Sequence, residues 1–314
     1  MHAVLGRGKN STVIAHPQDP KLAIKLSRLS RYTRRRSARL KAAGRTAEAK
    51  LAVRRDAANV GRRFDGIAAG LRAGMLTPHL VASAPCRVPT LTPGGRTFTH
   101  ASVMERARCD LVKFSKDGLL KTDKLARRLI FQVLWTLAAL QRNLGRSFRH
   151  NDSGLQNILV RRTPAPARKY VLSKRYQFCL PAGIDSCLSD FDFVNCGGDR
   201  RLSNSRVGKG GRYDISATPN LSYDARLFLT SFRRHADAGR LPATARWLHS
   251  LNLGSQARSE AYSRHLEPRQ LLKSKFFAKL RKHKDAAECA PRPSETYAIS
   301  SERSKEHGKQ AKSK

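Results

Sequence analysis

Two segments near the middle of the chain place carboxylate and amide side chains where they could support metal-assisted chemistry. Asp152 and Asn157 lie five residues apart in the segment His150–Asn157, which runs into the apolar stretch Ile158–Val160. A loop aspartate can accept a proton or orient a nucleophile, and an asparagine carbonyl is a neutral ligand for a hard cation such as Mg²⁺. Asp190 follows a second short apolar stretch and supplies the anionic ligand that the asparagine cannot.

A third segment, near the amino-terminal end, is suited to binding phosphate. Gly6 and Gly8 occur in the segment Gly6–Val13, and glycines in a turn let backbone N–H groups approach phosphate oxygens closely. Lys25 lies within the apolar segment Leu22–Leu26 that follows. A lysine within an apolar strand is costly unless it has an anionic partner, and a phosphate group is such a partner.

These segments together, in order across about Leu5–Leu229, resemble the protein kinase superfamily. The matches are Gly6-x-Gly8-x-x-Ser11-x-Val13 with the glycine-rich loop, Ala23-Ile24-Lys25 with the V-A-I-K lysine, Val103-Met104-Glu105 with the entry to the hinge, His150-x-Asp152-(x)4-Asn157 with H-R-D-x-x-x-x-N, and Asp190-Phe191-Asp192 with D-F-G. The His-Asn-Asp opening, the long stretch between Val160 and Asp190, and Asp-Phe-Asp are similar to divergent kinase-like proteins of large DNA viruses.

The resemblance implies an α+β, bilobal fold with a small β-rich N-lobe and a larger helical C-lobe, and ATP and Mg²⁺ as cofactors in the cleft between them. It implies transfer of the γ-phosphoryl group of ATP to Ser or Thr of a protein substrate. The implied catalytic residues are Asp152, Lys25 and Asn157; the implied nucleotide-binding residues are Gly6, Gly8, Ser11, Val13, Ala23, Lys25, Glu105, Ala107 and Leu159; and the implied Mg²⁺ ligands are Asn157 and Asp190.

Several positions depart from the kinase pattern. Asn151 replaces the arginine of H-R-D, Gly154 stands where many Ser/Thr kinases carry a lysine, and Asp192 replaces the glycine of D-F-G. No A-P-E sequence follows Asp190, which predicts a shortened substrate platform. These departures keep a catalytically impaired pseudokinase or scaffold open as an alternative, and also a small-molecule phosphotransferase.

Two further carboxylates could serve the implied site. A helix acid should pair with Lys25, and Asp65 is favoured over Glu48 and Asp56 because it lies 12 residues before a turn-like segment at Thr77–Leu80. Asp224 could be the buried aspartate that anchors the catalytic loop in related folds.

The net charge of +39, from 62 Lys and Arg against 23 Asp and Glu, is extreme. A hydrophobic content of 40% still permits a sizeable core, which excludes a wholly disordered basic protein. Basic clusters such as Arg34-Arg35-Arg36 and Lys273–Lys284 predict attraction to polyanions, with non-specific nucleic-acid binding as an alternative or additional function.

Cysteine usage and hydropathy predict an intracellular location, in the host cytoplasm or nucleus if the protein is viral, rather than secretion. The six cysteines form no C-x-x-C pair, and reduced thiols are expected. No apolar run is long enough to span a membrane, since Gln132 interrupts the longest candidate, Leu129–Leu140.

Hydrophobic periodicity predicts the elements that must position these residues. The clearest is a helix over Asp123–Leu144, whose leucines recur at three- and four-residue steps. Further expected elements are a β-hairpin from Ala3–Val13 and Leu22–Leu26, helical structure within Arg28–Arg72, strands near Leu80–Ala84, Thr97–Met104, Ile158–Val160 and Tyr176–Leu180, and helices at Tyr223–His235 and Ala243–Leu251. The expected domains are an N-lobe over 1–105, a C-lobe over 106–280 and a basic, disordered tail over 281–314.

Overall fold

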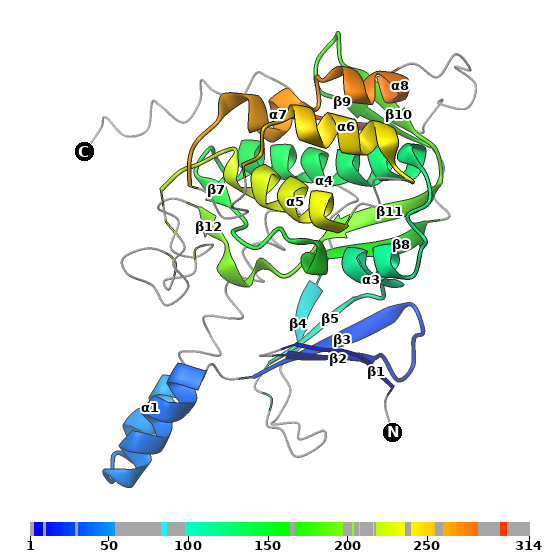
Figure 1. Cartoon of the computed structure of the whole chain (residues 1–314). Coiled ribbons are helices and arrows are strands. Elements are labelled where there is room, and N and C mark those ends of the chain that lie inside the picture. Colours follow the sequence, from blue (N-terminus) through cyan, green and yellow to red (C-terminus); the bar gives the residue numbers. More distant parts are fainter. Residues whose placement is uncertain are drawn as a thin grey trace. The chain divides into compact units, whose positions relative to one another are not determined.

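The structure is a computed structural model, and it describes residues 3–8, 11–28, 31–53, 83–86, 98, 100–163, 167–196, 203, 207, 216, 218–235, 240–254, 260–281 and 296–299 (Figure 1). The fold is mixed α+β, with mainly antiparallel sheets and several helices, as the resemblance implies. It divides into two compact units. Unit 1 holds the described residues of Met1–Met75, Leu80–Ala107 and Ser189–Thr218, and unit 2 those of Arg108–Leu188 and Pro219–Lys314.

Unit 1 is built on a five-stranded antiparallel sheet. Its order is β1-β2-β3-β5-β4, formed by β1 (Val4–Arg7), β2 (Ser11–Ala15), β3 (Leu22–Ser27), β4 (Ser83–Cys86) and β5 (His100–Glu105). The segment Ala3–Val13, expected as one arm of a hairpin, instead forms β1 and the start of β2. Successive side chains of β2 and β3 point to opposite faces of the sheet. Ile14 and Leu26 pack with Phe98 and Ala101 in a small core.

Helical structure follows β3, as the Arg28–Arg72 segment predicts. Helix α1 (Arg31–Ala42) ends at Gly44, whose φ of 72° is the left-handed conformation that glycine adopts at helix ends. Residues 46–53 are again helical. Unit 1 also contains the 3-10 helix η3 (Phe191–Phe193) and the short strand β12 (Asn195–Cys196).

Helix α4 (Asp123–Asn143) is the central element of unit 2 and confirms the predicted helix. It begins where the Thr122 hydroxyl accepts a hydrogen bond from the Leu125 amide at 3.2 Å. It contacts β11 (Gly183–Leu188), α5 (Tyr223–His235), α6 (Pro242–Ser250) and α7 (Pro268–Leu271), as Figure 1 shows. Because neighbours surround it, nearly every residue from Ala126 to Gln141 is buried, polar ones included.

The remaining elements of unit 2 are two sheets and several short pieces. One sheet has the order β11-β8-β6 and the other β10-β9-β13. Their bounds are β6 (Cys109–Asp110), β8 (Ile158–Thr163), β9 (Arg168–Val171), β10 (Gln177–Leu180) and β13 (Thr296–Ala298); the short pieces are α3 (Leu111–Lys116), β7 (Phe148–Arg149), η2 (Leu155–Asn157), η4 (Arg264–Leu266), η5 (Lys275–Phe277) and α8 (Ala278–Arg281).

Strand β13 differs from the prediction of a disordered tail from residue 281 onward. It runs parallel to β9, and the Ile299 amide donates to the Val171 carbonyl at 2.9 Å. Ile299 itself is buried. The polar composition of the tail concealed a short segment with enough apolar character to extend an existing sheet edge.

An aromatic cluster joins this second sheet to α4. Phe131 of α4 packs against Tyr170 of β9 and Phe178 of β10, with ring centroids 5.3 and 4.8 Å away. Trp135, one turn along α4, lies 5.1 Å from Tyr170, and Phe277 lies 5.8 Å from Phe131. Such large rings contribute most of the apolar area buried at an interface of this kind. The stretch between Val160 and Asp190 is therefore an integral part of the core of unit 2.

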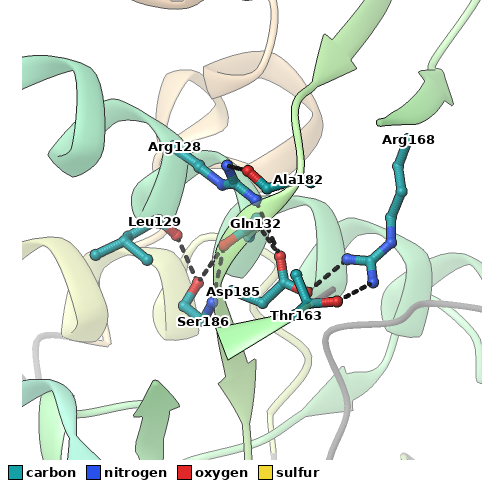
Figure 2. A network of polar contacts seen from close by, with 8 residues as sticks. All are labelled: Arg128, Leu129, Gln132, Thr163, Arg168, Ala182, Asp185 and Ser186. Atoms are coloured by element: carbon teal, nitrogen blue, oxygen red, sulfur yellow. Dashed lines mark hydrogen bonds and ion pairs between the residues drawn. The ribbon is translucent and has the colours of Figure 1, made fainter. Parts of the chain in front are cut away.

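A buried polar network holds the same elements together (Figure 2). The carboxylate of Asp185 on β11 is fully buried; it accepts hydrogen bonds from Arg168 at 2.5 Å and from Gln132 at 2.8 Å, and lies 3.4 Å from Arg128. Gln132 in turn accepts from the Ser186 amide at 2.8 Å. Gln132, the polar residue that interrupts the apolar run of α4, is thus the hydrogen-bonding link from the helix to β11.

Three cysteines among the described residues, Cys109, Cys187 and Cys196, are free thiols. Cys179 of β10 is disulfide-bonded, so the expectation of reduced cysteines is wrong for this residue. The expectation rested on spacing along the chain, whereas a disulfide depends on proximity in space. Among the described helices, none is both long and apolar enough to cross a membrane.

We predict that Asp185→Ala destabilises unit 2 by about 3–5 kcal/mol, because it leaves buried guanidinium groups without their carboxylate. Both tryptophans of the chain, Trp135 and Trp247, lie in unit 2, so urea unfolding followed by tryptophan fluorescence reports this unit. Asp117→Ala is the control, since its ion pair with Lys113 is largely exposed and should contribute less than about 1 kcal/mol. Equal midpoints for the two variants would contradict a stabilising role of the network.

Candidate active site

The segment from His150 to Asn157 forms a tight loop between β7 and β8 in unit 2. It ends in η2, where the Asn157 amide donates to the Gly154 carbonyl at 2.9 Å. The Asn157 side-chain nitrogen donates to the Asp152 carboxylate at 2.8 Å and to the Asp152 carbonyl at 2.7 Å. The loop therefore brings together Asp152 and Asn157, and it directs the amide oxygen of Asn157 away from that carboxylate.

Asp224, at the start of α5, is hydrogen-bonded to this loop at three points. Its buried carboxylate accepts hydrogen bonds from the His150 amide at 2.7 Å and the Asn151 amide at 2.8 Å. The Ser153 hydroxyl donates to the Asp224 backbone carbonyl at 2.7 Å. The residue that the resemblance suggested as a loop anchor thus has the geometry of one.

The backbone explains the asparagine in the His-Asn-Asp sequence. Asn151 has a φ of 66°, in the left-handed region that asparagine adopts more readily than most residues. This conformation turns the chain so that two successive amides face one carboxylate. Asp192, which replaces the glycine of D-F-G, lies within η3 and does not have a positive φ, so no glycine is required there.

An ion pair between a buried arginine and a partly exposed glutamate adjoins the loop at its N-terminal side. Arg149 is fully buried and donates through both terminal nitrogens to the Glu260 carboxylate, each at 2.9 Å. Its guanidinium lies over the Tyr223 ring, 3.9 Å from the ring centroid. The segment at Glu260 is itself fixed, because the Asn220 side chain donates to the Glu260 carbonyl at 2.7 Å.

Arg149 and Glu260 were not identified from the sequence. They lie 111 residues apart, and Arg149 belongs to no motif. The only signal was its position directly before His150.

Burial of Asp224 raises the pKa of its carboxyl to about 6, while the His150 and Asn151 amides and the positive charge of Arg149 act in the opposite direction.

Lys25 and Asp190 form an ion pair within unit 1. The Lys25 ammonium lies 2.9 Å from the Asp190 carboxylate, and the exposed fractions of the two side chains are 10% and 34%. Lys25 sits mid-strand in β3, opposite Val13 of β2 and Ser102 of β5. Asp190 has a φ of 61°, a conformation that costs a non-glycine residue of the order of 1 kcal/mol and recurs at functional sites.

Of the three acids considered as partners of Lys25, Glu48 lies within the described residues. Glu48 pairs with Arg45, through two exposed contacts of 2.5 and 2.6 Å, rather than with Lys25. Asp56 and Asp65 lie outside the described residues. Among the described residues, the acid that pairs with Lys25 is Asp190, the residue predicted as a Mg²⁺ ligand.

The glycine-rich segment forms the end of the β1–β2 pair. A Cβ added at Gly6 would lie in open space, whereas one at Gly8 would lie 3.2 Å from the Ser11 hydroxyl. Packing within the described residues therefore does not explain the glycine at position 6. An external group that approaches the backbone would explain it.

The residues expected around the adenine fall in both units. Val13 and Ala23 lie on β2 and β3, and Glu105 ends β5 opposite Leu22 of β3. Ala107 follows in unit 1, and Leu159 lies on β8 of unit 2. Among the predicted site residues, Lys25 forms an ion pair with Asp190, and Asn157 donates a hydrogen bond to Asp152.

The side chain of Gln156 occupies the space that a side chain at position 154 would enter. The side-chain amide of Gln156 lies 2.6 to 2.7 Å from the place where a Cβ of residue 154 would be. Glycine at position 154, where many Ser/Thr kinases carry a lysine, therefore leaves room for the exposed side chain of Gln156.

Comparison with known proteins gives a partial and distant likeness. No protein-family model matches the chain. A segment of 112 residues is 33% identical to a protein of Acanthamoeba polyphaga mimivirus named "Putative serine/threonine-protein kinase", covering 33% of this chain and 23% of that protein. The chain thus matches less than a quarter of the length of this relative. The likeness supports a kinase-like relationship.

We predict that the Asp224→Asn substitution changes the pH dependence of stability. Because the pKa of Asp224 in the folded chain, about 6, lies above the usual 3.8, the native state retains a proton that the unfolded chain releases between these values. The contribution of this group to the free energy of unfolding is therefore greatest below about pH 4 and is lost as the pH rises through 6.

The measurement is urea unfolding by tryptophan fluorescence at pH 4.5, 6.0 and 7.5. The stability advantage of the wild type over Asp224→Asn should shrink as pH rises, by at most about 3 kcal/mol. An advantage that grows with pH would contradict the raised pKa.

Proposed function

We propose that this chain is an ATP-dependent protein kinase that transfers the γ-phosphoryl group to Ser or Thr hydroxyls of protein substrates. The observation that carries the proposal is the 2.9 Å ion pair between Lys25 and Asp190, which are 165 residues apart and come from two independently recognised motifs. The likeness to the mimivirus protein supports the same function class.

The types of the residues assigned to the site fit a nucleotide and a divalent cation. Asp190 offers a carboxylate oxygen and Asn157 an amide oxygen, both donors of the kind that Mg²⁺ prefers. Lys25 carries the positive charge for the α and β phosphates, and Gly6 leaves its backbone accessible to a phosphate group. When bound, Mg²⁺ neutralises charge that develops on the phosphate oxygens.

In the proposed reaction, Asp152 orients the substrate hydroxyl and accepts its proton. The hydroxyl oxygen forms a bond to the γ-phosphorus while the bond to the β–γ bridging oxygen breaks, and ADP leaves. Asn157 fixes the Asp152 carboxylate through the 2.8 Å hydrogen bond. His150, whose amide is bound by Asp224, supports the loop structurally.

The remaining assignments belong to the same proposal. The adenine would pack among Val13, Ala23 and Leu159 and pair with the backbone at Glu105 and Ala107, with Gly8 and Ser11 covering the phosphates. In a bilobal kinase-like arrangement, residues 1–105 form the N-lobe, residues 106–280 the C-lobe and residues 281–314 a basic tail that includes β13.

Phosphoryl transfer from γ-labelled ATP to acidic and basic test proteins, and to the chain itself, tests the proposal. Asp152→Asn should lower kcat by about 10²- to 10⁴-fold, since general base catalysis contributes in that range. Asp190→Asn should abolish transfer. Glu48→Gln is the matched control, because its carboxylate pairs with Arg45, and it should retain activity within about twofold.

Absence of transfer by the wild type to any protein would refute the kinase assignment. Transfer that persists unchanged in Asp152→Asn would refute the role of this residue. Phosphorylation of a small hydroxylated metabolite, with no protein accepted, would favour the small-molecule phosphotransferase instead.

A further inference from the structure

Helix α1 carries an unusual concentration of positive charge within unit 1. Five of its cationic side chains are exposed, Arg34, Arg35, Arg36, Arg39 and Lys41. The sequence contains no Asp or Glu from residue 20 to residue 47. In the part of the chain that the structure describes, none of these five cations lies in an ion pair. Nothing in the proposed phosphotransfer chemistry requires such a helix.

The placement of these cations around the helix restricts what can bind it. At about 100° per residue, Arg34 and Lys41 lie on one flank and Arg35 and Arg39 on the other. The exposed Ala38 lies between the two flanks. The helix therefore presents two rows of positive charge that border a strip with small side chains.

The opposite face of α1 is polar and covered. Thr33 and Ser37 are buried, one turn apart, and Leu40 beside them is partly exposed. An interfacial membrane helix needs a continuous apolar face to enter the lipid, and the exposed face of α1 has none. This composition argues against insertion into a membrane surface and leaves a purely electrostatic partner.

We infer that α1 docks on the phosphate backbone of double-stranded DNA, independently of sequence. A helix of about 10–12 Å diameter fits the major groove, which is about 12 Å wide and is bordered by phosphates on both sides. The two rows of cations would each face one phosphate border, and Ala38 would lie toward the groove floor. Arginine suits this role because its planar guanidinium binds phosphate oxygens bidentately.

The number of phosphate contacts determines the salt dependence of binding. For duplex DNA, log Kobs falls against log salt concentration with a slope of about −0.9 for each phosphate neutralised. Removing three cations of α1 should therefore make the slope less steep by about 2.7.

The test is fluorescence anisotropy of a labelled 20-base-pair duplex titrated with the full chain at several NaCl concentrations. The triple variant Arg34→Gln, Arg35→Gln and Arg39→Gln should show the smaller slope and at least tenfold weaker binding at low salt. The matched control is Arg162→Gln, Arg246→Gln and Arg264→Gln, which removes the same charge from exposed positions of unit 2 and should retain the slope within about 1.

Equal losses in the two triple variants would show that net charge alone drives binding, and would overturn the assignment to α1. Absence of duplex binding by the wild type at low salt would also overturn it, as would α1-dependent binding to phosphatidylserine vesicles without binding to DNA. Circular dichroism of both variants verifies that they are folded. Because no ATP is present, these outcomes are independent of whether the chain transfers phosphate.

Discussion

The buried carboxylate of Asp224 is the constraint on which the candidate site depends. Two successive backbone amides, those of His150 and Asn151, can face one carboxylate only if the chain reverses sharply, and the positive φ of Asn151 provides that reversal. Asp152 is presented by this turn. Arg149, which is fully buried beside this loop, pairs with the carboxylate of Glu260, whose side chain is 40% exposed. The buried guanidinium thereby has an anionic partner, which burial of a charge requires.

Helix α4 provides the rigid support for this arrangement. It is buried on nearly all sides, and its polar residue Gln132 hydrogen-bonds to Asp185 and Ser186 of β11. The aromatic cluster around Phe131 and the carboxylate of Asp185 connect it to the stretch between the two motifs. The strands β9 and β10 are thereby packed against the helix that also contacts β7, the strand directly before the Asp152 loop.

Much of this could be predicted from sequence, for identifiable physical reasons. The leucine periodicity of α4 and the spacing of Asp152 and Asn157 are local features of the sequence. The first corresponds to the observed helix, and the second to the hydrogen bond between Asn157 and Asp152. The strands β9 and β11 were missed because they contain Arg168 and Asp185, charged residues that become acceptable in a core only when they pair with each other. The Lys25–Asp190 contact, the Arg149–Glu260 pair, the strand β13 and the disulfide at Cys179 depend on proximity between distant residues, which spacing along the chain does not encode.

In the proposed function, Lys25 and Asp190 mark a site for a nucleotide together with a divalent cation. Isothermal titration calorimetry of ATP into the full chain, with and without Mg²⁺, tests this claim without requiring a protein substrate. We expect one ATP bound per chain in the presence of Mg²⁺, and at least tenfold weaker binding when Mg²⁺ is omitted or when Asp190 is replaced by asparagine. Absence of ATP binding by the wild type, or equal affinity under all of these conditions, would contradict a nucleotide site at Lys25 and Asp190.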